Sequence, residues 1–84
     1  MNILFTPEAW EDYQWYINND RANLRRVNQL IKDIQRSPFE GIGKPEPLKF
    51  NLSGFWSRRI TGEHRIVYTV EDEIVKIIQC RFHY

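Results

Sequence analysis

Features that define many small proteins are scarce in this sequence. Its single cysteine, Cys80, has no partner for a disulfide bond within the chain. No apolar run is long enough to cross a bilayer, and the first residues lack the charged segment and apolar stretch of a secretion signal. We therefore expect a soluble cytoplasmic protein without membrane contact, and the length of 84 residues predicts one domain over residues 1–84.

An excess of charge of one sign is also missing. The net charge is +1, so composition alone does not indicate a nucleic-acid partner. The basic side chains nevertheless gather in the middle of the chain, where residues 44–65 carry a local charge of +3 and the two flanking segments carry −1 each. A short basic region suits a local phosphate site better than a long electrostatic track.

The first half of the chain has the pattern of a helical hairpin. Residues 2–5 form a short apolar run that suits an edge strand, and Thr6-Pro7 resembles a helix start. Asp20 can cap a second helix, which should end at Ser37-Pro38. Apolar side chains recur at helical spacing in both segments: Ala9, Trp10, Tyr13, Tyr16 and Ile17, then Leu24, Val27, Leu30, Ile31 and Ile34.

The second half predicts a long loop followed by strands. Residues 37–54 hold three of the four prolines and three of the four glycines, which indicates a loop. Three strand-like segments follow, 55–60, 65–70 and 74–82, with turns at 61–63 and 71–73. The predicted order is β-α-α-β-β-β, an α+β domain in which the helical hairpin packs on a small antiparallel sheet.

Several side chains in this half could cut RNA without a metal ion. The ribose 2′-hydroxyl can attack its own phosphate if a base removes its proton, cations stabilise the phosphorane and an acid protonates the leaving 5′-oxygen. Glu46, between two prolines, is a candidate base, and Lys49 follows it closely. His83 is a candidate acid near the end of the last strand, with Tyr84 beside it. The candidate phosphate-binding guanidinium groups are those of Arg58, Arg59 and Arg65.

Ordinary structural interpretations remain open for these residues. A loop glutamate can simply be solvated, strand arginines can form surface pairs, and a terminal histidine can be a frayed surface residue. We expect His64 to be a solvated turn residue and the aromatic side chains at 10, 13 and 16 to pack in the core. Cys80 should be a small buried hydrophobe. The acidic run 71–73 is too compact for a metal site and predicts a turn.

Across almost its whole length, the chain resembles the YoeB-type toxins of the RelE/ParE superfamily. Four segments carry the resemblance: PFEGIGKPEPLK at 38–49, NLSGFWSRRI at 51–60, EHRIVY at 63–68 and the ending CRFHY at 80–84. A match of this length is more specific than any short motif. The family's fold resembles RelE toxins and small microbial ribonucleases.

The resemblance also implies an activity and residue roles. It implies an endoribonuclease, without metal or cofactor, that cuts mRNA in the decoding site of the 70S ribosome during translation. The family's general base falls on Glu46, its phosphate-stabilising arginine on Arg65 and its general acid on His83. Tyr84 matches a further contributing position, and three more active-site positions fall on Lys49, Arg59 and Glu63.

The implied partner is a YefM-like antitoxin with a segment that folds on the toxin. Operator DNA would be contacted only through that antitoxin, and a homodimer remains open. Two non-catalytic alternatives also remain: a module of this fold that blocks the decoding site, and a protein that acts only within an antitoxin-bound transcriptional repressor.

Overall fold

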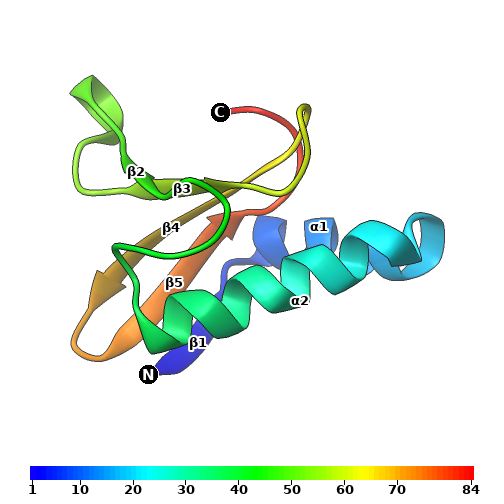
Figure 1. Cartoon of the computed structure of the whole chain (residues 1–84), viewed down its shortest axis with the longest axis horizontal. Coiled ribbons are helices and arrows are strands. Elements are labelled where there is room, and N and C mark those ends of the chain that lie inside the picture. Colours follow the sequence, from blue (N-terminus) through cyan, green and yellow to red (C-terminus); the bar gives the residue numbers. More distant parts are fainter.

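Two helices cover one face of a five-stranded sheet in the computed structural model, which describes all 84 residues (Figure 1). The sheet order is β1-β5-β4-β3-β2. The predicted α+β class and the predicted helical hairpin are therefore confirmed. The elements in chain order are β1 (Asn2–Phe5), α1 (Pro7–Asn19), α2 (Arg21–Arg36), β2 (Glu46–Pro47), a 3₁₀ helix (Phe50–Leu52), β3 (Trp56–Arg59), β4 (Arg65–Glu71) and β5 (Ile74–Gln79).

Both helices begin where side-chain caps predict. The Thr6 hydroxyl accepts a hydrogen bond from the Ala9 amide at 3.2 Å, and the Asp20 carboxylate accepts one from the Asn23 amide, also at 3.2 Å. Helix α2 ends at Arg36, directly before Ser37-Pro38. Neither helix is long and apolar enough to span a membrane.

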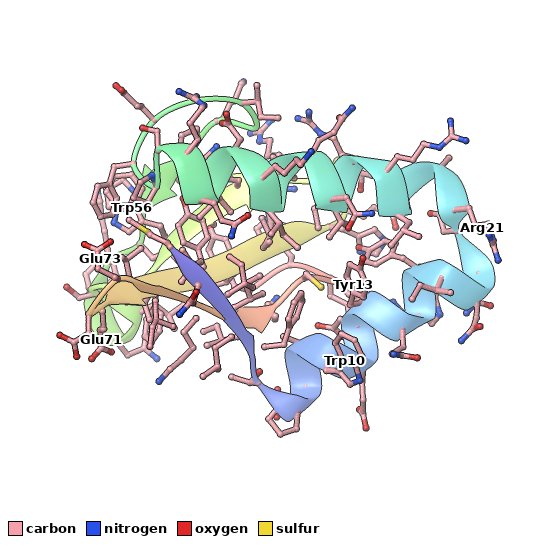
Figure 2. The ribbon with its side chains drawn as sticks, turned by 90° about the horizontal axis from the view of Figure 1, so that it is seen from below. Trp10, Tyr13, Arg21, Trp56, Glu71 and Glu73 are labelled. Atoms are coloured by element: carbon pink, nitrogen blue, oxygen red, sulfur yellow. The ribbon has the colours of Figure 1, made fainter.

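Core packing is confirmed for Tyr16 but is wrong for Trp10. Tyr16 is fully buried, and its hydroxyl donates to the Cys80 carbonyl at 2.8 Å. The Trp10 side chain is 49% exposed and stacks on Tyr13, with ring centroids 5.8 Å apart. Figure 2 shows both rings on α1, at the flank of the helical layer. Helical spacing identified the apolar side of α1, but the sheet covers only part of that side.

The sheet is mixed, so the prediction of an antiparallel sheet is wrong at one edge. Strand β1 pairs in parallel with β5, while the other strand pairs are antiparallel. Strand β5 ends at Gln79, three residues before the predicted end, because the Cys80 amide donates to the Asp12 carboxylate at 3.0 Å. The predicted loop 37–54 contains β2, a two-residue strand that holds Glu46 against Ser57 of β3.

Strand alternation sorts the arginines onto opposite faces of the sheet. Arg58 pairs with Ile66 on the face that the helices cover, whereas Arg59 pairs with Arg65 on the other face. Arg58 is fully buried. Our prediction that Arg58 binds RNA phosphate is therefore wrong, because its guanidinium points into the protein interior.

Arg58 instead links α2, the loop after it and the sheet. Its Nη1 donates to Asp33 Oδ2 at 2.6 Å and to the Ile42 carbonyl at 3.1 Å. Its Nε donates to the Tyr68 hydroxyl at 3.1 Å. Its Nη2 donates to the carbonyls of Ser37 and Glu40, at 2.6 and 3.1 Å. A buried charge is tolerated when it is paired and its donors are satisfied in this way.

Asp33 completes this cluster from α2. Hydrogen bonds from Arg36, the Ile42 amide and Arg58 hold the pKa of the Asp33 carboxyl well below its ordinary value of 3.8. Gly41 passes so close that a β-carbon there would clash with Asp33 Oδ2. The loop that leads to Glu46 is thus fixed to α2 at its first turn.

We predict that Asp33→Asn destabilises the protein at pH 7, because it leaves the buried Arg58 charge unpaired. A carboxylate with a lowered folded-state pKa stabilises the fold above its unfolded pKa and loses this effect as the pH falls through the folded value. The deficit of the variant should therefore shrink as the pH falls below about 3.8. Urea denaturation of the wild type and Asp33→Asn between pH 7 and pH 3 measures this difference in the free energy of unfolding.

Arg36→Gln serves as the control, because Arg36 also pairs with Asp33 but its side chain is 67% exposed. That variant should lose far less stability at pH 7. A deficit of Asp33→Asn that stays constant across the pH range would contradict the predicted role of the carboxylate.

Candidate active site

The sheet face away from the helices gathers most of the predicted catalytic residues. Cross-strand partners point to the same face, so the pairs Glu46–Ser57 and Arg59–Arg65 place three of those residues there. The last residues of the chain then cross this side of the sheet, and Figure 1 shows the red C-terminal end above β3, on the side opposite α2.

Three hydrogen bonds fix the C-terminal tail, residues 80–84, over this face. The Phe82 amide donates to His64 Nδ1 at 2.8 Å, and the Arg65 amide donates to the Phe82 carbonyl at 3.0 Å. At the end of the tail, the Tyr84 hydroxyl donates to Glu46 Oε1 at 3.1 Å. The tail thereby reaches from β4 to the loop that carries Glu46.

His64 is a residue whose role the sequence did not reveal. It is half-buried rather than solvated, so our prediction of a solvated turn residue is wrong. Its ring packs against Trp15, Tyr16 and Phe82, with centroids 6.2, 6.0 and 5.9 Å away. Trp15 and Tyr16 come from α1 and Phe82 comes from the tail, so only the completed fold brings these groups to His64.

The base of the tail is anchored to α1. Cys80 is buried as predicted, and burial raises the pKa of its thiol to about 12, so the thiol stays protonated. Burial also raises the pKa of Asp12, whose carboxylate accepts a hydrogen bond from the Cys80 amide. The Arg81 guanidinium lies 3.7 Å from the Trp15 ring centroid and 4.3 Å from that of Phe82.

Glu46 and Tyr84 line a surface hollow of about 390 Å³. Lys49 lines the same hollow, so this predicted residue lies beside the predicted base. Glu46 is exposed, and only its Oε1 atom has a hydrogen-bond partner in the protein. The other carboxylate oxygen is free to accept a proton or a hydrogen bond from a ligand.

Arg59 and Arg65 form a pair of cations directly opposite each other on β3 and β4. Like charges in this position repel, which makes the pair a natural site for an anion. Arg65 Nη1 donates to the carbonyls of Thr61 and His64, at 2.7 and 3.1 Å, and this orients the guanidinium. Its Nε and Nη2 atoms make no hydrogen bond within the protein, although only 8% of Arg65 is exposed, whereas Arg59 is exposed.

His83 is on the tail but does not line the Glu46 hollow. It lines a second hollow of about 280 Å³ together with Glu8, Glu11 and Asp12 of α1 and Arg81. Its Nδ1 lies 3.4 Å from the Tyr84 carbonyl.

Glu63 is exposed in the turn between β3 and β4, and its side chain makes no hydrogen bond or ion pair. No group of three or more His, Cys, Asp or Glu side chains is arranged to hold a metal ion.

The sequence matches one family over nearly all of its length. A model described as the YoeB-like toxin of the bacterial type II toxin–antitoxin system matches residues 5–84. The chain is 62% identical to toxin YoeB of Synechocystis, over all of this chain and 98% of that protein. It is 55% identical to toxin YoeB of Escherichia coli K12 over the whole of both chains.

Solved structures agree with this match. A YoeB/ParE toxin from Agrobacterium tumefaciens superposes with a TM-score of 0.97 at 46% identity and covers both chains completely. YoeB in the heterotetrameric YoeB–YefM complex from Staphylococcus aureus superposes with a TM-score of 0.91 at 52% identity, over all of this chain and 98% of that one. The chain belongs to the YoeB-like toxins of bacterial type II toxin–antitoxin systems.

Proposed function

We propose that this toxin is a ribosome-dependent mRNA endoribonuclease that cuts RNA without a metal ion and thereby inhibits translation in the cytoplasm. The hydrogen bond between Tyr84 and Glu46 is the observation that carries the proposal. It joins the C-terminal tail to the proline-bracketed loop on the same sheet face as Arg65. The Glu46 carboxylate and the Arg65 guanidinium thus share this face, and His83 is the residue before Tyr84 on the same tail.

In the proposed reaction, Glu46 removes the proton of the ribose 2′-hydroxyl. The 2′-oxygen then attacks the adjacent phosphorus, and the bond from phosphorus to the 5′-oxygen breaks. His83 protonates that 5′-oxygen, so the products carry a 2′,3′-cyclic phosphate and a 5′-hydroxyl. Hydrolysis of the cyclic product would give a 3′-phosphate.

Arg65 is the group proposed to stabilise the charge that develops on the phosphorane. Its Nη1 is engaged by backbone carbonyls, so the free Nε and Nη2 present two donors to phosphate oxygens without reorganisation. Arg59, opposite Arg65 on β3, and Lys49, in the Glu46 hollow, add positive charge, and Glu63 stays a proposed active-site residue. Tyr84 orients Glu46 through its hydroxyl.

The ribosome is proposed to supply the orientation that the free toxin lacks. His83 faces the acidic hollow beside α1 rather than Glu46 in the free protein. A message threaded between the tail and the loop would bring the leaving oxygen to His83 while the 2′-hydroxyl meets Glu46. In-line geometry of this kind supplies a large part of the rate of phosphodiester cleavage.

A YefM-like antitoxin is the proposed protein partner. The proposal rests on the relatives from Staphylococcus aureus, which include a YoeB–YefM complex and a YoeB dimer. Operator DNA would be contacted through the antitoxin.

The competing function is that of a module that occupies the decoding site without cutting the message. Primer extension on translated message separates the two functions. Inhibited translation with intact message would favour the blocking module.

We predict that Glu46→Gln slows single-turnover cleavage on translating ribosomes by about 10²- to 10⁴-fold, because the amide cannot accept the proton. End-group analysis of the wild-type products should find the cyclic phosphate or 3′-phosphate and the 5′-hydroxyl, also with chelator at magnesium levels that keep ribosomes intact. Glu71→Gln, an exposed carboxylate at the far end of β4, is the matched control and should cut normally. Products with 3′-hydroxyl ends would rule out this reaction.

A second prediction concerns the tail. His64→Ala removes the acceptor for the Phe82 amide, so the tail should loosen and cleavage should fall by up to about 10²-fold while the fold persists. Hydrogen exchange at the Phe82 amide, compared with core amides of β4, measures the loosening. Unchanged exchange together with full activity would remove His64 from the positioning of the tail.

A further inference from the structure

Phe50 combines two unfavourable features beside the candidate active site. Its side chain is 91% exposed, far more than any other large apolar side chain of the protein. Its backbone has φ of +58°, in the left-handed region that bulky residues rarely adopt. Glycine or asparagine would occupy this position with less strain. Packing therefore gives no reason for a phenylalanine here.

Three of the other four non-glycine residues with positive φ have local explanations. Asp72 and Glu73 are the central pair of the two-residue β4–β5 hairpin, which requires positive φ at both positions. Phe82, with φ of +63°, is held by hydrogen bonds of both its amide and its carbonyl. Backbone strain that no packing or hydrogen bond explains occurs mostly at functional sites.

The segment around Phe50 holds the ring in a fixed place. The Leu48 amide donates to the Phe55 carbonyl at 2.9 Å, which closes the loop. Within it, the Ser53 amide donates to the Phe50 carbonyl at 3.0 Å and the Leu52 amide to the Lys49 carbonyl at 3.1 Å. Leu48 is buried and anchors the loop. The ring is therefore presented to solvent by a short, hydrogen-bonded turn.

The neighbours of Phe50 indicate what the ring would contact. Phe50 lines the hollow that also contains Glu46, Lys49 and Tyr84. An exposed aromatic ring beside a lysine is the combination with which proteins bind single-stranded RNA, because the ring stacks on a base and the cation meets the backbone. A message whose phosphate is at Glu46 would place a flanking base within this same hollow.

We propose that Phe50 forms a base-stacking subsite for a nucleotide of the message next to the cleaved phosphate. The proposal rests on the proposed function, since it takes the message to be the occupant of the hollow. Stacking accepts any base, so Phe50 would strengthen binding and fix the position of the message without reading its sequence.

The test measures binding, so that it does not depend on cleavage. Programmed ribosomes carry a message with a 2′-O-methyl group at the cut site and either a normal or an abasic nucleotide beside it. Phe50→Ala should weaken toxin binding to the normal complex by about 5- to 100-fold. The abasic message should weaken binding of the wild-type toxin by a similar factor. It should have little further effect on binding of the variant, because both changes remove the same contact.

Other variants separate stacking from bulk and from stability. Phe50→Tyr should retain affinity, whereas Phe50→Leu, apolar but not aromatic, should behave like the alanine variant. Phe50→Gly should raise the thermal midpoint, because it relieves the left-handed strain, and yet lose affinity. Opposite changes in stability and binding are the signature of a residue retained for contact with a ligand.

Four results would overturn the proposal. Equal affinity of the alanine variant and the wild type would remove the subsite, and full affinity of Phe50→Leu would exclude stacking. An abasic effect of the same size in both proteins would assign the ring to a ribosomal base. Normal ribosome binding with weakened antitoxin binding would assign it to the antitoxin. The wild type could also lose affinity for the abasic message, with little further loss in Phe50→Ala, and yet never cut an unmodified message. That result would refute the proposed function and leave the stacking subsite standing.

Discussion

Arg58 connects three parts of the chain that the backbone hydrogen bonds of the sheet do not join. Its guanidinium bonds to Asp33 at the end of α2, to three carbonyls of the following loop and to Tyr68 on β4. Since the loop continues through Gly43, whose carbonyl accepts the Arg59 amide at 2.7 Å, to β2, the position of Glu46 depends on this buried ion pair. The candidate base is thus held from the opposite side of the sheet.

The same strand that buries one arginine exposes the next. Arg58 and Arg59 are adjacent, and alternation sends one into the helix-covered face and the other to the open face opposite Arg65. One arginine therefore stabilises the scaffold, while its neighbour joins the cation pair at the site. The tail over this open face is held by Asp12, His64 and Arg65, so α1 and β4 together position its last residues.

Local features of the sequence predicted the helices well and the long-range pairings poorly. The caps at Thr6 and Asp20 and the stop at Ser37 depend on neighbouring residues, so the sequence predicted both helix starts and the end of α2 correctly. The parallel pairing of β1 with β5 joins residues more than 70 positions apart, and periodicity contains no information on such a partner. The early end of β5 likewise depends on Asp12, a residue of another element.

The candidate site shows the same division. Residue types and the family resemblance led to the proposal of Glu46, Arg65, His83 and Tyr84, but they did not separate buried Arg58 from exposed Arg59. That distinction requires the register of β3, in which one residue of slip exchanges the two faces. The role of His64 was missed because it depends on where the tail returns, and the strain at Phe50 is a backbone property that composition does not reveal.

Glu46, Arg65 and His83 are proposed to act on one RNA phosphodiester. The most direct measurement is a structure of the toxin on a translating ribosome whose message carries a 2′-O-methyl group at the cut site. The proposed mechanism predicts the Glu46 carboxylate beside the 2′-oxygen, Arg65 on the phosphate and His83 turned from the acidic hollow toward the 5′-oxygen. A bound message with His83 still facing α1, or with Glu46 away from the ribose, would contradict it.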